Sequence, residues 1–403
     1  MRNAAAKARE IESDIYLPFA RHVTDTVISL STRALITVIR IDGISFETAE
    51  AVDLNDLHAK LNLTLRNIAD DRLALWSYLV RRQTSDYPSG TFSSTFSAAL
   101  DAQYRERLRS EALFRNDLYL TLVWHPGRAT TDAAAAFFKR LGRASRRSVE
   151  VDSEALKRLD DAKRDVVAAL ERYDARVVGL VDRDGIVFSE PMELLHAVTS
   201  GEWMPMPLPQ GPIGPALYSN RIIFGREALE IRSAGGSRFA GMFGIKEYPA
   251  STRPGLLNAL LSAPFELILT QSFAFLSKAD AKTVLTRKQN QLVSAQDPAA
   301  SQIDELSDAL DDLESNRFAL GDHHLSLLLS ADTASQLQGH MSVARRALAD
   351  AGAVVAREDL GLEAAYWAQL PGLFKYRARA GAISSRNLDR KSTRLNSSHL
   401  VIS

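Results

Sequence analysis

The first half of the chain alternates between two periods of apolar positions. Residues 35–41 (LITVIRI) are typical of a strand with at least one buried face, and leucines then recur at helical spacing over residues 54–68. Strand-like runs follow at residues 73–80 and 118–124, with a charged helix predicted between them at residues 96–113. The order strand, helix, strand, helix, strand predicts a sheet with helices packed on it.

The second half repeats this scheme. The predicted strands are residues 221–225, 228–233, 241–248, 266–276, 324–330 and 353–359, and the predicted helices are residues 254–263 and 335–351. This order is typical of a split β-α-β unit with an insertion between its halves. The sequence therefore predicts an α+β protein with two split β-α-β, ferredoxin-like sheet subdomains that carry their helices on one side.

The insertion, about residues 279–317, is predicted to be a helical hairpin. Its first arm is basic and its second arm is acidic, so the arms attract each other. Ile303, Leu306, Leu310 and Leu313 form a heptad-like seam on the second arm. Such a hairpin either lies solvated on its own sheet or contacts another chain, and the pattern favours neither.

Three parts of the chain follow from these patterns. We expect an N-terminal α/β subdomain at residues 1–150 and a second α/β subdomain with the hairpin at residues 216–388. Residues 151–215 between them are expected to form a long helix, over residues 154–181, and a linker. Five prolines within residues 205–215 oppose regular structure in that linker.

The end of the chain is predicted to be a disordered artefact. Residues 389–399 read DRKSTRLNSSH, which resembles the translation of a standard short-read sequencing adapter, and residues 400–403 follow it. We therefore leave residues 389–403 out of the fold and expect a gene that is cut at this point.

Composition and charge exclude several classes of function. The chain has no cysteine, which removes disulfides, thiolate metal sites and cysteine nucleophiles. Lys+Arg and Asp+Glu both number 49, so no strong nucleic-acid footprint is expected. The apolar stretch 256–276 nearly has the length of a membrane span, but Pro264, Glu266 and Gln271 interrupt it. It is predicted to be a short helix, a break and a buried strand.

The sequence offers no residues for catalysis, nucleotide binding or metal binding. No GxxxxGK(S/T) loop and no Gly-Lys pair occurs in it. Gly235 and Gly236 are followed by a predicted strand, which indicates a hairpin turn and not a dinucleotide loop. His323 and His324 are adjacent in or beside a predicted strand, where neighbouring side chains point to opposite faces and cannot easily share a metal.

One segment has a more specific composition. Residues 363–387 read EAAYWAQLPGLFKYRARAGAISSRN and combine aromatic residues, a Pro-Gly turn and three arginines. The segment resembles a signature of the large cytoplasmic ATPases of type IV secretion and conjugation systems, the CagE/TrbE/VirB class. Further resemblance lies at residues 61–82, 87–96, 113–126, 245–281 and 320–333. The sequence departs from the family pattern at Leu373 and Leu388, where Asn and Phe are usual.

The resemblance implies the N-terminal and central region of such an ATPase, cut before the ATPase domain. The parent protein would bind ATP and Mg and energise DNA or protein transport across a bacterial envelope, whereas this fragment would be inactive and hold no cofactor. The resemblance also implies a hexamer at the cytoplasmic side of the inner membrane, peripheral to it and docked to channel components. Trp367, Pro371, Gly372, Arg377 and Arg379 are then the candidate contacts with the missing ATPase domain or a neighbouring subunit.

Two alternatives stay open at this point. The chain could be a self-contained α/β enzyme with an unrecognised site, which a deep pocket with several convergent ionisable groups would favour. It could instead be a nucleic-acid-binding module, although its neutral net charge argues against strong, salt-sensitive binding. If the resemblance holds, Trp367 and Leu370 should pack against the second sheet, and Pro371-Gly372 should turn the chain toward the missing ATPase domain.

Overall fold

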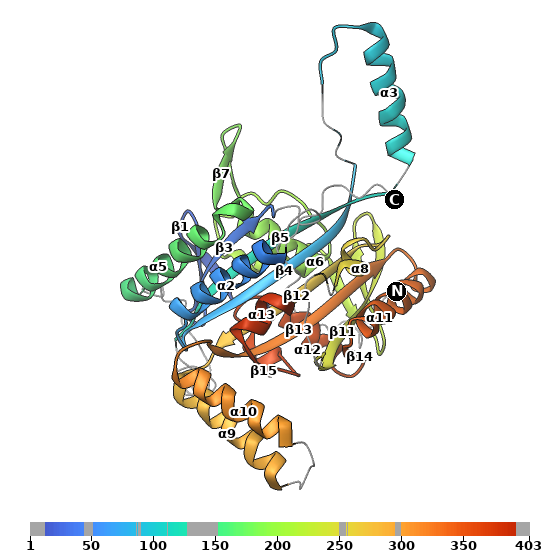
Figure 1. Ribbon diagram of the computed structural model, residues 1–403. Coiled ribbons are helices and arrows are strands. Elements are labelled where there is room, and N and C mark those ends of the chain that lie inside the picture. The colour runs from blue at the N-terminus through green and yellow to red at the C-terminus, as the bar shows by residue number, and fades with distance from the viewer. Residues whose placement is uncertain are drawn as a thin grey trace, which may run out of the picture.

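One large antiparallel sheet organises the molecule (Figure 1). The computed structural model describes residues 13–43, 51–85, 87, 90–110, 112–126, 152–249, 255, 257–294 and 300–391. Within them the sheet has 13 strands in the order β1-β2-β3-β5-β4-β12-β13-β11-β10-β9, and β6, β14 and β15 pair beside this path. Strands β7 and β8 form a separate hairpin.

The first half of the sheet is a ferredoxin-like unit. Its elements are β3 (Leu35–Ile41), α2 (Ala51–Asn67), β4 (Leu73–Thr84), β5 (Leu113–Trp124), α5 (Ser153–Ala169) and β6 (Ala175–Val177). Strand β5 lies antiparallel between β3 and β4, and β6 pairs with the other side of β3. A split β-α-β unit is present as predicted, but its second helix, α5, and its fourth strand, β6, come from residues 151–215, outside the predicted subdomain 1–150. The helix predicted at residues 96–113 is α3 (Thr95–Ser110), which is inserted between β4 and β5.

The second half has the same topology. Its elements are β11 (Gly236–Glu247), α8 (Asn258–Leu261), β12 (Leu267–Phe275), β13 (Leu320–Ala331), α11 (Ala334–Asp350) and β14 (Val354–Arg357). Strand β13 lies between β11 and β12, and β14 pairs with the other side of β11. Helices α9 (Lys278–Ser294) and α10 (Ala300–Glu314) are inserted between β12 and β13, at the position that α3 occupies in the first unit.

The remaining elements flank the two units. A strand pair extends each unit on its outer side: β1 (Phe19–Thr24) and β2 (Val27–Leu30) beside β3, and β9 (Arg221–Phe224) and β10 (Leu229–Ser233) beside β11. The others are η1 (Ser13–Tyr16), η2 (Glu171–Tyr173), β7 (Leu180–Arg183), β8 (Ile186–Ser189), α6 (Glu190–Ser200), α7 (Ile213–Leu217), α12 (Leu362–Ala368), η3 (Phe374–Tyr376), β15 (Gly381–Ser384) and α13 (Ser385–Lys391).

The two units share one sheet, which corrects the prediction of separate sheets. Strand β4 pairs with β12 along the register from Arg81↔Leu267 to Ala74↔Ala274. Every residue of β12 is buried, as is nearly all of β4 up to Arg81. An isolated edge would leave the N–H and C=O groups of these apolar strands unpaired, and edge-to-edge pairing satisfies them.

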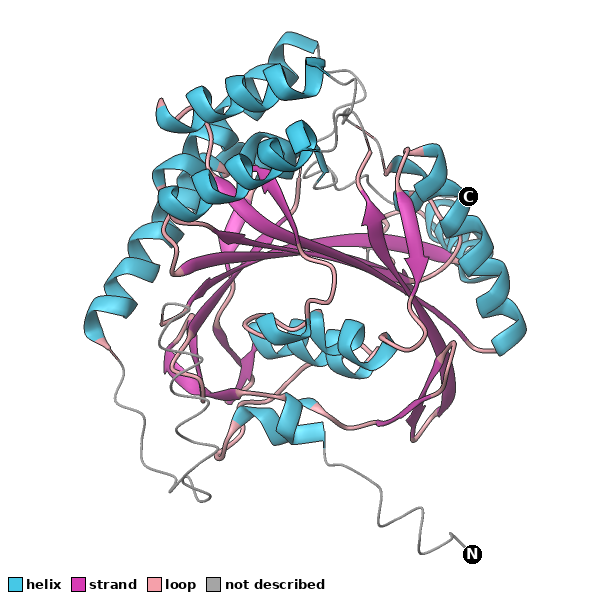
Figure 2. Ribbon diagram, turned by 90° about the horizontal axis from the view of Figure 1, so that it is seen from below, coloured by secondary structure: helices cyan, strands magenta, loops and turns pink. Residues whose placement is uncertain are grey.

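Helices cover both faces of the sheet (Figure 2). The helices of the two split β-α-β units, α2, α5, α8 and α11, lie on one face as predicted, and α6, α7 and α12 add a layer on the other face. Leu75, Leu269 and Leu327 belong to a core beneath α2, α5, α8, α11 and α13. Trp76 and Ile268, their neighbours in sequence, belong to the core beneath α6, α7 and α12. Because successive strand residues point to opposite faces, continuous apolar strands require a layer on each face.

Helix α5 is shorter than predicted. Its N-terminus is capped by Asp152, whose carboxylate accepts hydrogen bonds from the backbone N–H of Glu154 and Ala155. The helix ends at Ala169, and Asp174 then takes a left-handed conformation. Residues 175–177, which were predicted to continue the helix, instead form strand β6, because the outer side of β3 offers backbone partners there.

The apolar stretch 256–276 contains helix α8 and the buried strand β12, as predicted. No helix within the described ranges combines the length and apolar character that a membrane crossing requires. Residues 389–403 were predicted to be disordered. Residues 389–391 instead belong to helix α13, and residues 392–403 lie outside the described residues.

Candidate assembly surface at residues 362–388

Helix α12 and the loop after it lie on the sheet where the two units meet. Trp76 Nε1 donates a hydrogen bond to the Ala368 carbonyl at 3.3 Å, and the Tyr78 hydroxyl donates one to the Gln369 carbonyl at 2.7 Å. Both donors come from β4, the strand of the first unit that pairs with the second unit. Helix α12 also packs on β11 of the second unit. The segment therefore contacts both halves of the sheet.

Trp367 is the centre of an aromatic cluster. It is 1% exposed and stacks on Tyr16 with ring centroids 4.5 Å apart and planes 4° apart. Tyr366 and Phe224 flank the indole at 5.2 and 6.2 Å. The Tyr366 hydroxyl also donates a 2.6 Å hydrogen bond to the Thr199 carbonyl of α6. Trp367 thus joins the chain's N-terminal segment, the second unit and α12 in one core.

The Pro-Gly turn follows Leu370, which is buried in the same apolar core as Trp367. Gly372 has φ +88°, and a Cβ atom at this position would lie 2.7 Å from Leu30 Cδ2. Both the backbone conformation and the close approach to β2 therefore favour glycine. Pro371 is buried beside it. The predicted turn is present, and it packs against the first unit.

Arg377 is held against the sheet by aromatic rings and a backbone carbonyl. Its guanidinium lies 5.0 Å from the Phe374 ring centroid and 5.9 Å from that of Trp76. Its Nη1 donates a hydrogen bond to the Asp322 carbonyl at 3.2 Å. The side chain is half-buried, and its guanidinium contacts these groups of its own chain.

Arg379 forms an ion pair with Glu358. The Glu358 side chain is 4% exposed, whereas that of Arg379 is 39% exposed. Burial raises the pKa of Glu358 above its usual value, and the positive charge of Arg379 opposes this rise. Among the five predicted contact residues, Arg379 is the one whose side chain is exposed. The other four residues pack against their own chain.

The adjacent histidines of β13 lie on opposite faces of the sheet. The His323 ring is within hydrogen-bonding distance of Gln271 Oε1 (3.1 Å) and of the Tyr248 hydroxyl (2.9 Å). His324 is opposite Ser272 in the strand register, on the face where Arg377 lies. Burial, with the nearby charges of Arg377 and Arg379, lowers the pKa of His324 to about 4. His324 is therefore neutral at physiological pH.

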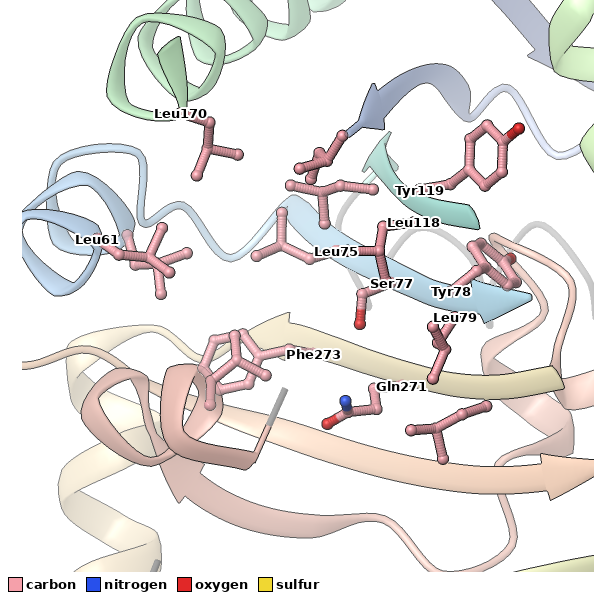
Figure 3. Close-up of a pocket in the computed structure, with 15 residues that line it drawn as sticks. Leu61, Leu75, Ser77, Tyr78, Leu79, Leu118, Tyr119, Leu170, Gln271 and Phe273 are labelled. Atoms are coloured by element: carbon pink, nitrogen blue, oxygen red, sulfur yellow. The ribbon is translucent and has the colours of Figure 1, made fainter. Parts of the chain in front are cut away.

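A small apolar cavity lies on the face opposite α12 (Figure 3). Its volume is about 70 Å³, well below the roughly 300–1,000 Å³ of sites for cofactor-sized molecules. Leu61, Leu75 and Phe273 line its wall, with Ser77 and Gln271 as polar groups. No Asp, Glu, Lys, Arg or His side chain lines it. The cavity thus lacks the convergent ionisable groups that the enzyme alternative requires.

The described residues also do not fit ATP or its magnesium ion. Ala234 and Gly235 form the turn of the β10–β11 hairpin, which is closed by the pairing of Ser233 with Gly236, the first residue of β11. A phosphate cradle would need a glycine-rich loop that opens a helix. Within the described ranges no three acidic or histidine side chains are grouped closely enough to hold a metal ion.

Sequence reasoning missed two residues of this surface. They are Tyr16, which stacks on Trp367, and Glu358, which pairs with Arg379. Both lie outside the segment 363–387 that the sequence singled out. Glu358 did carry a usable signal, because it is a charged residue at the end of a predicted apolar strand. Tyr16 carried none, since it precedes the first recognisable element.

Comparisons with known families match most of the chain. Residues 176–379 match the CagE, TrbE, VirB family, component of type IV transporter system. Residues 26–131 match the N-terminal domain of the type IV secretion system ATPase VirB4/TrbE. The first match ends at Arg379 and so includes α12 and the Pro-Gly turn.

Curated relatives extend the similarity to almost all of the sequence. The chain is 51% identical to the type IV secretion system protein virB4 of Bartonella quintana over 379 residues, which are 94% of this chain and 48% of the relative. It is 41% identical to the protein virB4 of Agrobacterium fabrum (95% and 48%) and 33% identical to the type IV secretion system protein PtlC of Bordetella pertussis (95% and 47%). The chain spans about half the length of the curated relatives it matches.

Proposed function

This chain belongs to the CagE, TrbE, VirB family of type IV transporter components, and from that premise we propose that it is the assembly portion of a secretion ATPase. The carrying observation is the match of residues 26–131 to the N-terminal domain of such an ATPase, in a sequence without a phosphate loop. Two hollows support an assembly role over a self-contained enzyme. The 70 Å³ cavity has no charged lining, and the open hollow of about 820 Å³ along α9 is lined by Lys282 and Arg287 and, among the described residues, by no acidic or histidine side chain.

In a protein of the relatives' full length, we propose that ATP and Mg bind in the half that this chain does not span. That protein would energise transport of DNA or protein across the bacterial envelope. It would assemble as a hexamer at the cytoplasmic side of the inner membrane and dock there to channel components. The role proposed for this chain is to provide surfaces for these contacts.

The first test is nucleotide turnover. Purified residues 1–403 should release phosphate from Mg-ATP no faster than buffer, because the described residues do not form a phosphate cradle. A protein of the relatives' full length that contains this chain should be active in the same assay. Robust magnesium-dependent turnover by the chain alone would overturn the proposal.

Arg379 is the residue we propose for contact with the nucleotide-binding half. Its guanidinium is partly exposed and is oriented by the buried carboxylate of Glu358. In the full-length protein, Arg379→Ala should lower ATP turnover roughly tenfold, the effect of losing about 1.4 kcal/mol at the contact.

Lys375→Ala is the matched control for this variant. Lys375 is an exposed cation four residues earlier, and its Nζ lies over the Tyr376 ring. The control should leave turnover unchanged, and circular dichroism should give both variants the wild-type fold. Equal turnover in Arg379→Ala and in the wild type would remove Arg379 from the proposed contact.

A further inference from the structure

Helix α3 presents a row of apolar side chains to solvent. Phe96 is 74% exposed, Leu100 56% and Tyr104 48%, and their spacing of four places them on one ridge of the helix. Figure 1 shows α3 clear of the sheet, beyond the ends of β4 and β5. Contiguous apolar side chains exposed in this way mark an interaction site.

The flank of α3 next to this ridge is anchored within the chain. The Tyr87 hydroxyl donates a 2.7 Å hydrogen bond to Asp101 Oδ1, and the Arg105 guanidinium lies 4.7 Å from the Tyr87 ring centroid. Asp101 and Arg105 are half-buried, in contrast to the ridge of Phe96 and Leu100. The Tyr104 ring, at the end of the ridge, also lies 6.5 Å from the Tyr87 ring centroid, whereas Phe96 and Leu100 have no covering layer among the described residues.

The equivalent position in the second unit indicates what covers such a helix. Helices α9 and α10 are inserted between β12 and β13 as α3 is between β4 and β5, and they cover each other. Their seam buries Ala281, Leu285 and Leu313 to less than 10% exposure. Across it, Gln289 donates a 2.9 Å hydrogen bond to Ser307. One helix in the first unit thus stands where the second unit has a pair.

We propose that α3 of a second copy of this chain supplies the missing helix, packed antiparallel across a two-fold axis near Leu100. A row of side chains at every fourth position packs into the matching groove of an identical helix, with axes inclined by about 50°. A two-fold contact brings the same ridge together from both copies, so the ridge needs to complement only itself. Phe96 of one copy then lies near Tyr104 of the other.

The charges along α3 favour the antiparallel arrangement. The second half of the helix carries Arg105, Arg107 and Arg109 against Glu106, a net charge of +2, whereas the first half carries only Asp101. Antiparallel packing places the acidic half of one copy against the basic half of the other. Parallel packing would bring the arginines of both copies together, which Coulomb repulsion opposes.

The size of this contact predicts a weak dimer. An aromatic side chain buries about 150–250 Å² when fully covered, so three side chains from each copy bury on the order of a few hundred Å² per copy. A stable interface buries roughly 800 Å² per partner. The α3 contact alone should therefore form only at high protein concentration, and it should strengthen when other contacts hold copies together.

Cysteine cross-linking of the whole chain tests the proposal, because residues 1–403 contain no cysteine. Leu100→Cys, near the two-fold axis, should give a disulfide-linked dimer under mild oxidation, with a yield that rises with protein concentration. Ala102→Cys, exposed on the opposite side of α3, is the matched control and should give about tenfold less. Adding Phe96→Glu to Leu100→Cys should lower the dimer yield by a similar factor.

Three results would overturn the proposal. Equal cross-linking of Leu100→Cys and Ala102→Cys would indicate random collision. A sedimentation profile that stays monomeric at all concentrations, without cross-linking, would indicate another partner. Preferential cross-linking of Leu100→Cys to Val284→Cys on α9 in a mixed sample would indicate head-to-tail contact instead. The altered side chains are exposed, so unfolding does not confound these outcomes, and none of them depends on ATP turnover.

Discussion

Trp367→Ala should lower the free energy of unfolding by about 3–5 kcal/mol, the largest effect expected from a single substitution in this chain. The indole is 1% exposed, so its removal leaves a cavity that the surrounding strands cannot fill. The substitution also removes the stacking on Tyr16, whose ring is parallel to the indole at 4.5 Å. Urea denaturation followed by far-UV circular dichroism measures this change from the shift in midpoint.

Trp203→Ala is the matched control for this prediction. Trp203 also stacks on a tyrosine, Tyr119 at 5.7 Å, but it is only half-buried. Its loss should therefore destabilise the chain clearly less than the loss of Trp367. A second variant, Trp367→Phe, keeps an aromatic ring beside Tyr16 and should recover part of the stability. If Trp367→Ala and Trp203→Ala shift the urea midpoint equally, the claim that Trp367 is the centre of the buried cluster around α12 is wrong.

Acidification from about pH 7 to about pH 4 should remove about 3 kcal/mol of stability through His324. The pKa of this buried imidazole is lowered from 6.5 to about 4 by burial and by Arg377 and Arg379. Each pKa unit corresponds to about 1.4 kcal/mol. The unfolded chain takes up a proton near pH 6.5 and the folded chain does not, so stability is present above that pH and is lost as the pH falls toward 4.

The His324→Gln variant isolates this effect. Its stability should fall less steeply over the same pH range, because the glutamine does not titrate. Burial also lowers the pKa values of His22 and His196, and these residues remain in both proteins. Glu358 acts in the opposite direction: its raised pKa gives stability that is present below about pH 4.5 and is lost as the pH rises. Identical pH slopes in the variant and the wild type would contradict the burial of a neutral His324.

The alternation of strand and helix periods predicted most elements of the two split β-α-β units, although α5 and β6 of the first unit were expected to lie outside it. Residues 35–41 are β3, and the leucines of residues 54–68 lie largely within α2. The hairpin insertion also appeared in the sequence, because the leucines of α10 recur at helical spacing. In each of these cases the signal lies within one element and its immediate neighbours.

The joining of the two sheets could not be predicted from periodicity. The pairing of β4 with β12 connects residues that are almost two hundred positions apart, and hydrophobic spacing does not specify the partner of an edge strand. The strands did contain a sign that both faces are covered. Residues 73–80 (LALWSYLV) are apolar on both alternating sets of positions, which is typical of a strand between two layers.

The contacts of the candidate surface also join segments far apart in the sequence, so periodicity could not predict them. Residues 363–387 were identified from composition and resemblance, but their role within the chain depended on Tyr16, Trp76 and Glu358, which come from other elements. The proposed self-contact of α3 had no sequence signal either. Its apolar row became informative only when the structure left it exposed and provided α9 and α10 for comparison.

The central claim is that this chain is an assembly portion that does not bind nucleotide. The most direct test is calorimetric titration of residues 1–403 with a non-hydrolysable ATP analogue in the presence of Mg. The described residues form no phosphate cradle and no metal site, so no saturable heat should appear up to millimolar nucleotide. Saturable binding at micromolar concentration with a stoichiometry near one per chain would contradict the proposed function.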